Sequence, residues 1–158
     1  MSRRSVSILT FIVLMILLTF LLLFMKTQSK VNQAESEAVT LIEYEMPVKA
    51  VNQFYWTTIQ DAYFSLDFTN ADDDRKYAII EQDGGHVHYF DYSALLTQEE
   101  AASIIEEENE GINLLQTRLG LKDTIPVWEV TSKQHDGTLI YFYIDATTGN
   151  LVDTIENI

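Results

Sequence analysis

Two stretches of this chain, 62–92 and 126–156, align without a gap at a constant offset of 64 residues. This repeat limits the possible folds more than any other feature, because a fixed period indicates one supersecondary unit used twice. Ala38 and Ala102, in two predicted helices, keep the same offset. The repeat rests on matching apolar and turn positions, since few residues are identical to their counterparts. These residues are Asp72, Tyr77, Ile80 and Gly85.

Each repeat is predicted to begin with a helix, because the apolar residues of 34–46 and 97–109 recur at helical spacing. Thr97 and Glu100 form a capping-box pattern at the start of the second helix. An alternative extends this second helix to Leu119, although Gly111 and Thr117 disfavour that extension.

Four strands are predicted to follow each helix, because apolar and polar residues alternate between polar turns. Gly85 and Gly149 are expected to take positive φ in hairpin turns. The predicted strands of the two repeats are 51–57 and 115–121, 63–70 and 127–132, 76–81 and 138–145, and 86–92 and 150–155. The expected fold class is α+β: an N-terminal transmembrane helix, then two small tandem units, each with one helix packed on an antiparallel sheet of about four strands.

An uncharged apolar run covers residues 8–25 and contains fourteen Leu, Ile, Phe or Val residues among its eighteen. A helix of this length spans about 27 Å, close to the thickness of the hydrocarbon layer. Arg3 and Arg4 favour a cytoplasmic N-terminus, whereas Lys26 and Lys30 weaken the contrast. A cleaved signal peptide is the alternative, but the run is too long and no small-x-small site follows it. We therefore expect a single-pass signal anchor in the plasma membrane, with the bulk of the chain extracytoplasmic.

The charge of the chain is unevenly distributed. All 24 acidic residues and only six of the 10 basic residues lie after Lys30, so the exported part carries a formal charge of −18. No basic stripe exists to meet phosphates, which excludes nucleic acid as a partner on ordinary electrostatic grounds. Two interpretations stay open: the charge meets a basic partner, or it keeps the domain soluble.

Candidate chemical groups are few. His86 and His88 would share one face of a strand, but no third metal ligand accompanies them. The acidic run 72–74 lacks the alternation of a calcium loop. The chain has no cysteine, no nucleophile motif and no phosphate-binding glycine loop. The sequence therefore predicts no enzyme, no catalytic residue, no cofactor and no metal site.

Aromatic residues are the better indication of function. The runs 54–56 and 141–143 place rings on both faces of their strands, and only one face can meet the helix. The other face is buried between the two units or contacts a partner. Tyrosine and tryptophan are frequent interface anchors. The candidate partner-binding residues are Tyr55, Trp56, Tyr141 and Tyr143.

The second repeat carries the most specific motif. Val127-Trp128-Glu129-Val130 is followed by an aromatic strand that runs into Asp145, a Thr-Gly turn and a closing strand, 141–152. This ending is similar to that of PepSY domains, and the helix start at 97–102 also fits. The first repeat departs from the pattern, because Asp83-Gly84-Gly85 replaces the Asp-x-x-Thr-Gly turn. An N-terminal anchor followed by two such units resembles the TseB-like family of cell wall elongation regulators of Gram-positive bacteria.

The resemblance implies residues 1–30 as cytoplasmic tip, anchor and juxtamembrane segment, 31–94 as the first PepSY-like unit and 95–158 as the second. It implies a non-enzymatic protein, tethered to the plasma membrane lipid bilayer, without catalytic residues. Its expected partner is a penicillin-binding transpeptidase or another cell wall elongation component, whose activity it would modulate. Two alternatives remain: a PepSY-type extracytoplasmic protease inhibitor, and a sensor for an envelope ligand.

Overall fold

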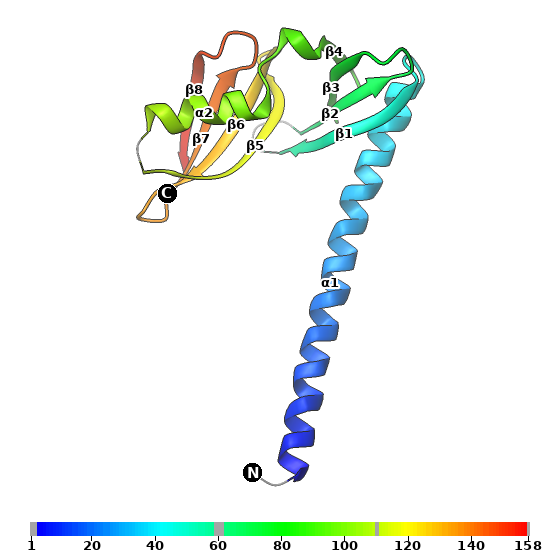
Figure 1. The fold of residues 1–158 in the computed structure, drawn as a ribbon, viewed down its shortest axis with the longest axis vertical. Coiled ribbons are helices and arrows are strands. Elements are labelled where there is room, and N and C mark those ends of the chain that lie inside the picture. Colours follow the sequence, from blue (N-terminus) through cyan, green and yellow to red (C-terminus); the bar gives the residue numbers. More distant parts are fainter. Residues whose placement is uncertain (1–2, 59–61, 110, 158) are drawn as a thin grey trace. The chain divides into compact units, whose positions relative to one another are not determined.

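The computed structural model describes residues 3–58, 62–109 and 111–157 (Figure 1). The chain divides into two compact bodies, Met1–Glu37 and Ala38–Ile158. They are described separately below.

Helix α1 is continuous over Arg3–Glu43, so the two predicted helical segments are one element. Its apolar side chains between Leu9 and Met25 are exposed, and by length and composition it is the one helix of the described residues that is apolar enough to cross a membrane. The helix ends at Glu43, earlier than the predicted end at Met46. Pro47 disfavours helical backbone at Met46, and Tyr44 and Glu45 form a turn that leads out of the helix.

The first sheet contains β1 (Val48–Thr57), β2 (Tyr63–Asn70), β3 (Arg75–Glu81) and β4 (Val87–Asp91) in antiparallel sequence order. One face of this sheet packs against the last turns of α1. The buried residues of this core are Ala38, Ile42, Leu66, Phe68, Ala78 and Ile80.

The second repeat forms the same arrangement after a short 3-10 helix, η1 (Tyr92–Ala94). Its elements are α2 (Gln98–Glu108), β5 (Asn113–Lys122), β6 (Ile125–Lys133), β7 (Leu139–Asp145) and β8 (Leu151–Asn157), and the sheet order again follows the sequence. The predicted α+β class is confirmed. The predicted capping box at Thr97 and Glu100 is present as well. The extension of the helix to Leu119 is wrong, because that segment is strand β5.

The predicted offset of 64 residues holds for the second and third strands of each sheet and for the start of the fourth, where Val87 corresponds to Leu151; a register shift between Tyr143 and Ile144 then changes it by one residue. Leu66 pairs with Ala78 in the first sheet, and Val130 pairs with Phe142 in the second. Side chains alternate between the faces of a strand, so equal registers give the two sheets matching faces.

The offset is 63 residues in the earlier elements. Ala38 and Ile42 are buried in the first repeat, and Ala101 and Ile105 take their places in the second. Pairing of β1 with β2 and of β5 with β6 shows the same offset. The equivalence of Ala38 with Ala102 is therefore wrong by one residue. The shift lies between the first and second strands, where the second repeat is one residue longer.

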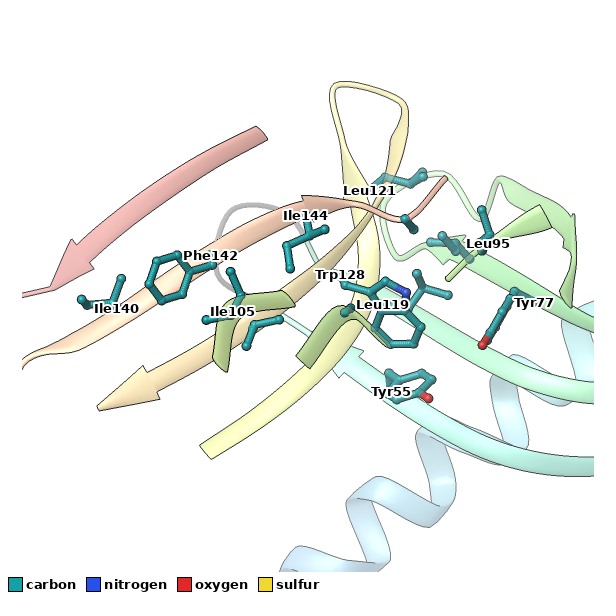
Figure 2. Packing of buried hydrophobic residues seen from close by; sticks show 14 residues of the cluster. Tyr55, Tyr77, Leu95, Ile105, Leu119, Leu121, Trp128, Ile140, Phe142 and Ile144 are labelled. Atoms are coloured by element: carbon teal, nitrogen blue, oxygen red, sulfur yellow. The ribbon is translucent and has the colours of Figure 1, made fainter. Parts of the chain in front are cut away.

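A shared core joins the two sheets (Figure 2). The fully buried Trp128 of β6 meets Tyr55 and Tyr77 of the first sheet edge-to-face, with ring centroids 5.4 and 6.0 Å away. Its indole Nε1 donates a hydrogen bond to the carbonyl oxygen of Leu96 at 2.8 Å. Ala101 and Ile105 of α2 belong to the same core. The sheets therefore form one hydrophobic interior.

Gly149 and Gly85 provide a test of the turn geometry. Both take positive φ, 78° and 69°, as predicted. A Cβ at 149 would approach Ile104 Cδ1 to 3.2 Å, whereas a Cβ at 85 would meet nothing within 4 Å. Gly85→Ala should lower the free energy of unfolding by about 1 kcal/mol through backbone strain alone. We expect Gly149→Ala to cost more, measured by chemical denaturation; equal costs would contradict the packing at Gly149.

Candidate functional site

The backbone of β5 lies against the first sheet. Ser65 Oγ and Thr57 Oγ1 both donate hydrogen bonds to the carbonyl oxygen of Leu119, at 2.9 and 3.2 Å. All three residues are buried. A carbonyl oxygen has two lone pairs, so these two donors satisfy it fully. The first sheet therefore holds β5 by polar as well as apolar contacts.

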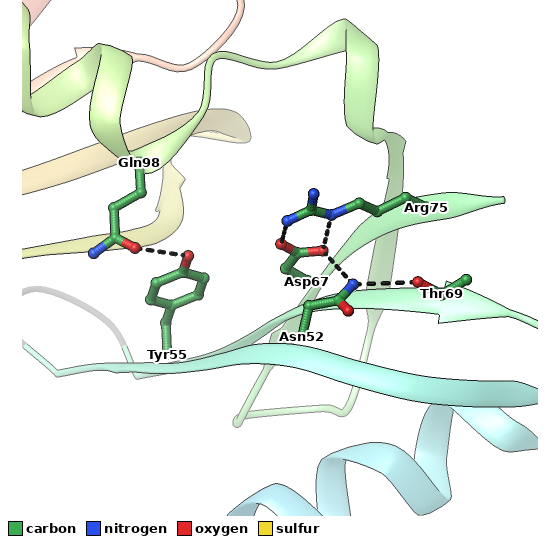
Figure 3. Close-up of polar contacts among 6 residues, drawn as sticks. All are labelled: Asn52, Tyr55, Asp67, Thr69, Arg75 and Gln98. Atoms are coloured by element: carbon green, nitrogen blue, oxygen red, sulfur yellow. Dashed lines mark hydrogen bonds and ion pairs between the residues drawn. The ribbon is translucent and has the colours of Figure 1, made fainter. Parts of the chain in front are cut away.

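Tyr55 occupies the centre of this junction (Figure 3). Its hydroxyl donates to Gln98 Oε1 at 3.2 Å, and Gln98 Nε2 donates to the carbonyl oxygen of Thr117 at 3.1 Å. Burial raises the pKa of Tyr55 far above its usual value, and the nearby Asp67 carboxylate adds to the rise. The hydroxyl therefore stays protonated and remains a hydrogen-bond donor at all physiological pH values.

A salt bridge lies beside Tyr55. Arg75 Nε donates to Asp67 Oδ1 at 2.8 Å, and Arg75 Nη2 bonds Asp67 Oδ2 (Figure 3). Asn52 Nδ2 donates to Asp67 Oδ1 at 3.0 Å, and the Arg75 guanidinium lies 3.8 Å from the ring centroid of Tyr92. The hydrogen bond to Asp67 holds the pKa of Arg75 above its usual value. Bidentate geometry makes this pair stronger than an ordinary surface ion pair.

These residues line a cavity of about 110 Å³ between the first sheet and the start of α2. Asp67 and Arg75 are two of its lining residues, and they already neutralise each other. Catalysis by a general base needs a carboxylate that is free to accept a proton, and Asp67 has both oxygens bonded. These residues are therefore best explained as structural contacts between the two repeats. We call Tyr55, Asp67, Arg75 and Gln98 the polar joint.

The structure separates the four predicted partner-binding residues. Tyr55 is buried in the junction. Trp56 lies on the opposite face of the first sheet, half-buried, with its ring 5.4 Å from that of Phe64. Tyr141 and Tyr143 lie together on the face of the second sheet opposite α2. Partner binding at these residues stays a prediction, and only Tyr141 and Tyr143 share one face.

Glu129 lies on the same face as Tyr141 and Tyr143. It pairs with Arg118 on β5 and with Tyr143 on β7. Only 1% of Glu129 is exposed, and the Tyr143 hydroxyl donates to its Oε2 at 3.4 Å. Its Oε1 is buried without a hydrogen-bond partner among the described residues. Burial raises the pKa of Glu129, and the charge of Arg118 opposes the rise.

Lys122 borders this face. Its Nζ lies 2.7 Å from Asp153 Oδ2 and 4.8 Å from the ring centroid of Tyr143. We call Arg118, Lys122, Glu129, Tyr141 and Tyr143 the Glu129 face. No role of Glu129 was predicted from the sequence. Its position between Trp128 and Val130, in an otherwise apolar part of the strand, was the available signal.

The other candidate groups lie apart from this face. His86 lies outside the strand that carries His88, and His88 Nε2 is 2.8 Å from Glu81 Oε1. Among the described residues, no cluster of three metal-ligating side chains occurs. In the acidic turn, Asn70 Oδ1 accepts bonds from the backbone amides of Asp72 and Asp74.

Tyr55→Phe tests the polar joint. The variant leaves Gln98 Oε1 without its donor, so the free energy of unfolding should fall by about 1 kcal/mol. Tyr92→Phe is the matched control, because it keeps the ring beneath Arg75 and no hydrogen bond of its hydroxyl is recorded in the described structure. Thermal and chemical denaturation measure both. Equal destabilisation by the two variants would contradict the role given to Gln98.

The buried carboxylate of Glu129 predicts a pH dependence. Because its pKa is raised in the folded state, folding favours the protonated form, so wild-type stability should fall as pH rises from about 4.5 through the raised pKa. Glu129→Gln should remove this component and raise the melting temperature at neutral pH. Glu106→Gln, on the exposed face of α2, removes the same charge and is the control. A pH profile unchanged by Glu129→Gln would contradict the raised pKa.

Comparison with known families identifies the second repeat. Residues 95–155 match the PepSY family model, described as the peptidase propeptide and YPEB domain. The matched segment includes α2, β5, β6, β7 and the first five residues of β8. PepSY domains are typically non-catalytic propeptide or inhibitor-like domains, and no catalytic family is indicated. No curated protein matches the chain.

Solved structures extend the likeness in fold. The YpmB protein from Bacillus subtilis superposes with a TM-score of 0.66 at 22% identity, over 77% of this chain and 96% of that protein. A protein from Clostridium difficile 630, described as a lipoprotein, aligns over 78% of this chain and 92% of its own, with 8% identity and a TM-score of 0.42. The likeness to YpmB is one of fold. Residues 95–155 therefore carry the PepSY sequence pattern, within a two-sheet body that has the fold of YpmB.

Proposed function

We propose that this is a membrane-anchored, extracytoplasmic, non-enzymatic protein that binds and modulates a cell wall synthesis enzyme during elongation. The partner we propose is a penicillin-binding transpeptidase. The observation that carries the proposal is a PepSY match in a chain whose first helix is apolar enough to cross a membrane. The resemblance to TseB-like regulators supplies the class of partner.

The arrangement suits a binding protein. A shared core and several buried hydrogen bonds hold the two sheets as one interior, so the body can present a surface of fixed shape. An anchor confines that surface to the membrane plane. Confinement raises the effective concentration of a partner in the same membrane, and a weak interface is then sufficient.

A second candidate is an extracytoplasmic inhibitor of a protease. It is favoured by the description of the matching family, which names peptidase propeptides. The candidates differ in the class of partner and share the mode of action, binding without catalysis.

Crosslinking in intact cells distinguishes the two. The full anchored chain would carry a photoreactive residue at Tyr141 or, as a control, at Ser103 on the exposed face of α2. Enrichment of a penicillin-binding transpeptidase from position 141 over position 103 supports the cell wall function. Enrichment of a membrane protease supports the inhibitor. Equal capture from both positions would contradict a partner surface at Tyr141.

Tyr141→Ala gives a quantitative prediction for the captured partner. If Tyr141 is an interface anchor, its truncation should weaken binding by about 2 kcal/mol. Tyr44→Ala removes the same ring from a position that is 85% exposed and should leave affinity unchanged. Affinities measured with the purified full chain in detergent, together with melting temperatures, separate loss of binding from loss of folding.

A further inference from the structure

The carboxyl group of Glu129 is closed off from solvent and only partly bonded. Its side chain is 1% exposed, and Oε1 has no hydrogen-bond partner among the described residues. The Tyr143 hydroxyl reaches Oε2 at 3.4 Å, which is long for a hydrogen bond between two oxygens. Such a site tolerates a neutral carboxyl group but leaves a carboxylate poorly compensated. The geometry therefore requires a cation at Oε1 whenever Glu129 ionises.

The chain holds a suitable cation next to this carboxyl group. Arg118 of β5 lies directly opposite Glu129 in the strand register, and its charge acts on Glu129. Its guanidinium makes no hydrogen bond or ion pair with another described residue. Residues opposite each other in an antiparallel pair have their Cβ atoms about 5 Å apart, well within the length of an arginine side chain. Arg118 can therefore reach Oε1 without a change in the sheet.

The remaining titratable groups on this side of the second sheet are less suitable. Besides Arg118, they are Lys122, Lys133, Tyr141, Tyr143, Asp145 and Asp153. Lys122 Nζ is bonded to Asp153 Oδ2 at 2.7 Å, and this bond holds the pKa of Asp153 below its usual value, so the pair stays charged in weak acid. Asp145 Oδ1 accepts two backbone amides of its own turn, and Lys133 lies at the exposed end of β6. Arg118 is therefore the cation best placed for Glu129.

Closure of the site determines that the cation comes from within the chain. Glu129 and Tyr143 are 1% and 4% exposed, so a cation from outside has no access to the carboxyl group. Arg118 is half-buried, so part of its side chain lies at the surface. Partly exposed side chains change rotamer within nanoseconds and need no movement of the backbone. Rotation of Arg118 is therefore the smallest change that compensates an ionised Glu129.

We propose that Glu129 and Arg118 form a proton-controlled switch on the Glu129 face. While Glu129 carries a proton, Arg118 stays unpaired, which is the arrangement of the described structure. When Glu129 releases the proton, the guanidinium turns onto the carboxylate and donates to Oε1, since its planar fork matches a carboxylate. The face then presents a free guanidinium beside Tyr141 at acid pH and a neutral, closed pair at higher pH. This switch does not depend on the proposed function.

The test is a pH titration of the purified full chain in detergent, followed by NMR. Glutamate carboxyl carbons and arginine Nε–H groups are labelled, and the two signals are assigned by their loss in Glu129→Gln and Arg118→Gln. We expect Glu129 to titrate with a midpoint above 4.5, and the Arg118 signal to shift and exchange more slowly with solvent at the same midpoint. An Arg118 signal that ignores this titration overturns the proposal. So does a Glu129 signal without a midpoint between about pH 4 and 8.

Arg118→Gln and Lys133→Gln remove the same charge from the position opposite Glu129 and from the exposed end of β6. We expect Arg118→Gln to raise the Glu129 midpoint by about one pH unit or more, and Lys133→Gln by less than about 0.3. Equal shifts would indicate a general effect of charge and would overturn the switch. In Glu129→Gln, which keeps the shape of the side chain, the Arg118 signal should be independent of pH; a persisting dependence overturns it as well. These measurements involve no cellular partner, so the proposed function and the switch can fail separately.

Discussion

Burial of Trp128 between the two sheets is the interaction on which the rest of the structure depends. The indole fills the space between Tyr55 and Tyr77, and its N–H bonds the carbonyl of Leu96 just before α2. One side chain thus contacts three parts of the body: it lies on the second sheet, bonds the segment before α2 and packs on one face of the first sheet. A repeat of about 60 residues buries a small share of its surface and is only marginally stable alone. The shared core adds the buried apolar surface that each repeat lacks.

Polar groups in the junction bond to one another and so make the packing of the two sheets more specific. Ser65 and Thr57 share the Leu119 carbonyl, Gln98 links Tyr55 to β5, and Asp67 is clamped by Arg75. Buried polar groups that find partners in only one arrangement favour that arrangement over alternatives. Three side chains of the described residues keep a buried oxygen without a hydrogen-bond partner: Tyr89, Ser132 and Glu129, the last on the face of the second sheet opposite α2.

Local signals were sufficient to predict most of the fold. The capping box at Thr97, the alternation of the strands and the turn glycines act within a few residues, and the predicted elements follow them closely. The one-residue change of offset escaped prediction, because it depends on which helical alanine meets the sheet, Ala101 or Ala102. The position of Tyr55 and the burial of Glu129 also depend on contacts between distant segments. Alternation shows that two faces exist; it does not show which face the neighbouring repeat covers.

Glu129 takes the place of Ser65 at the 64-residue offset, and a carboxylate accepts hydrogen bonds where the Ser65 hydroxyl donates one. This difference has a consequence for the order of the two modules along the chain. A chain with the modules exchanged would bring the Glu129 carboxylate against the strand carbonyl that Ser65 and Thr57 now satisfy. The carboxyl group could then donate to that carbonyl only by staying protonated, which costs free energy at neutral pH. The two units are therefore not equivalent at this position. The helix-free face of the first repeat suits contact with the second repeat, and the corresponding face of the second repeat does not suit the same contact.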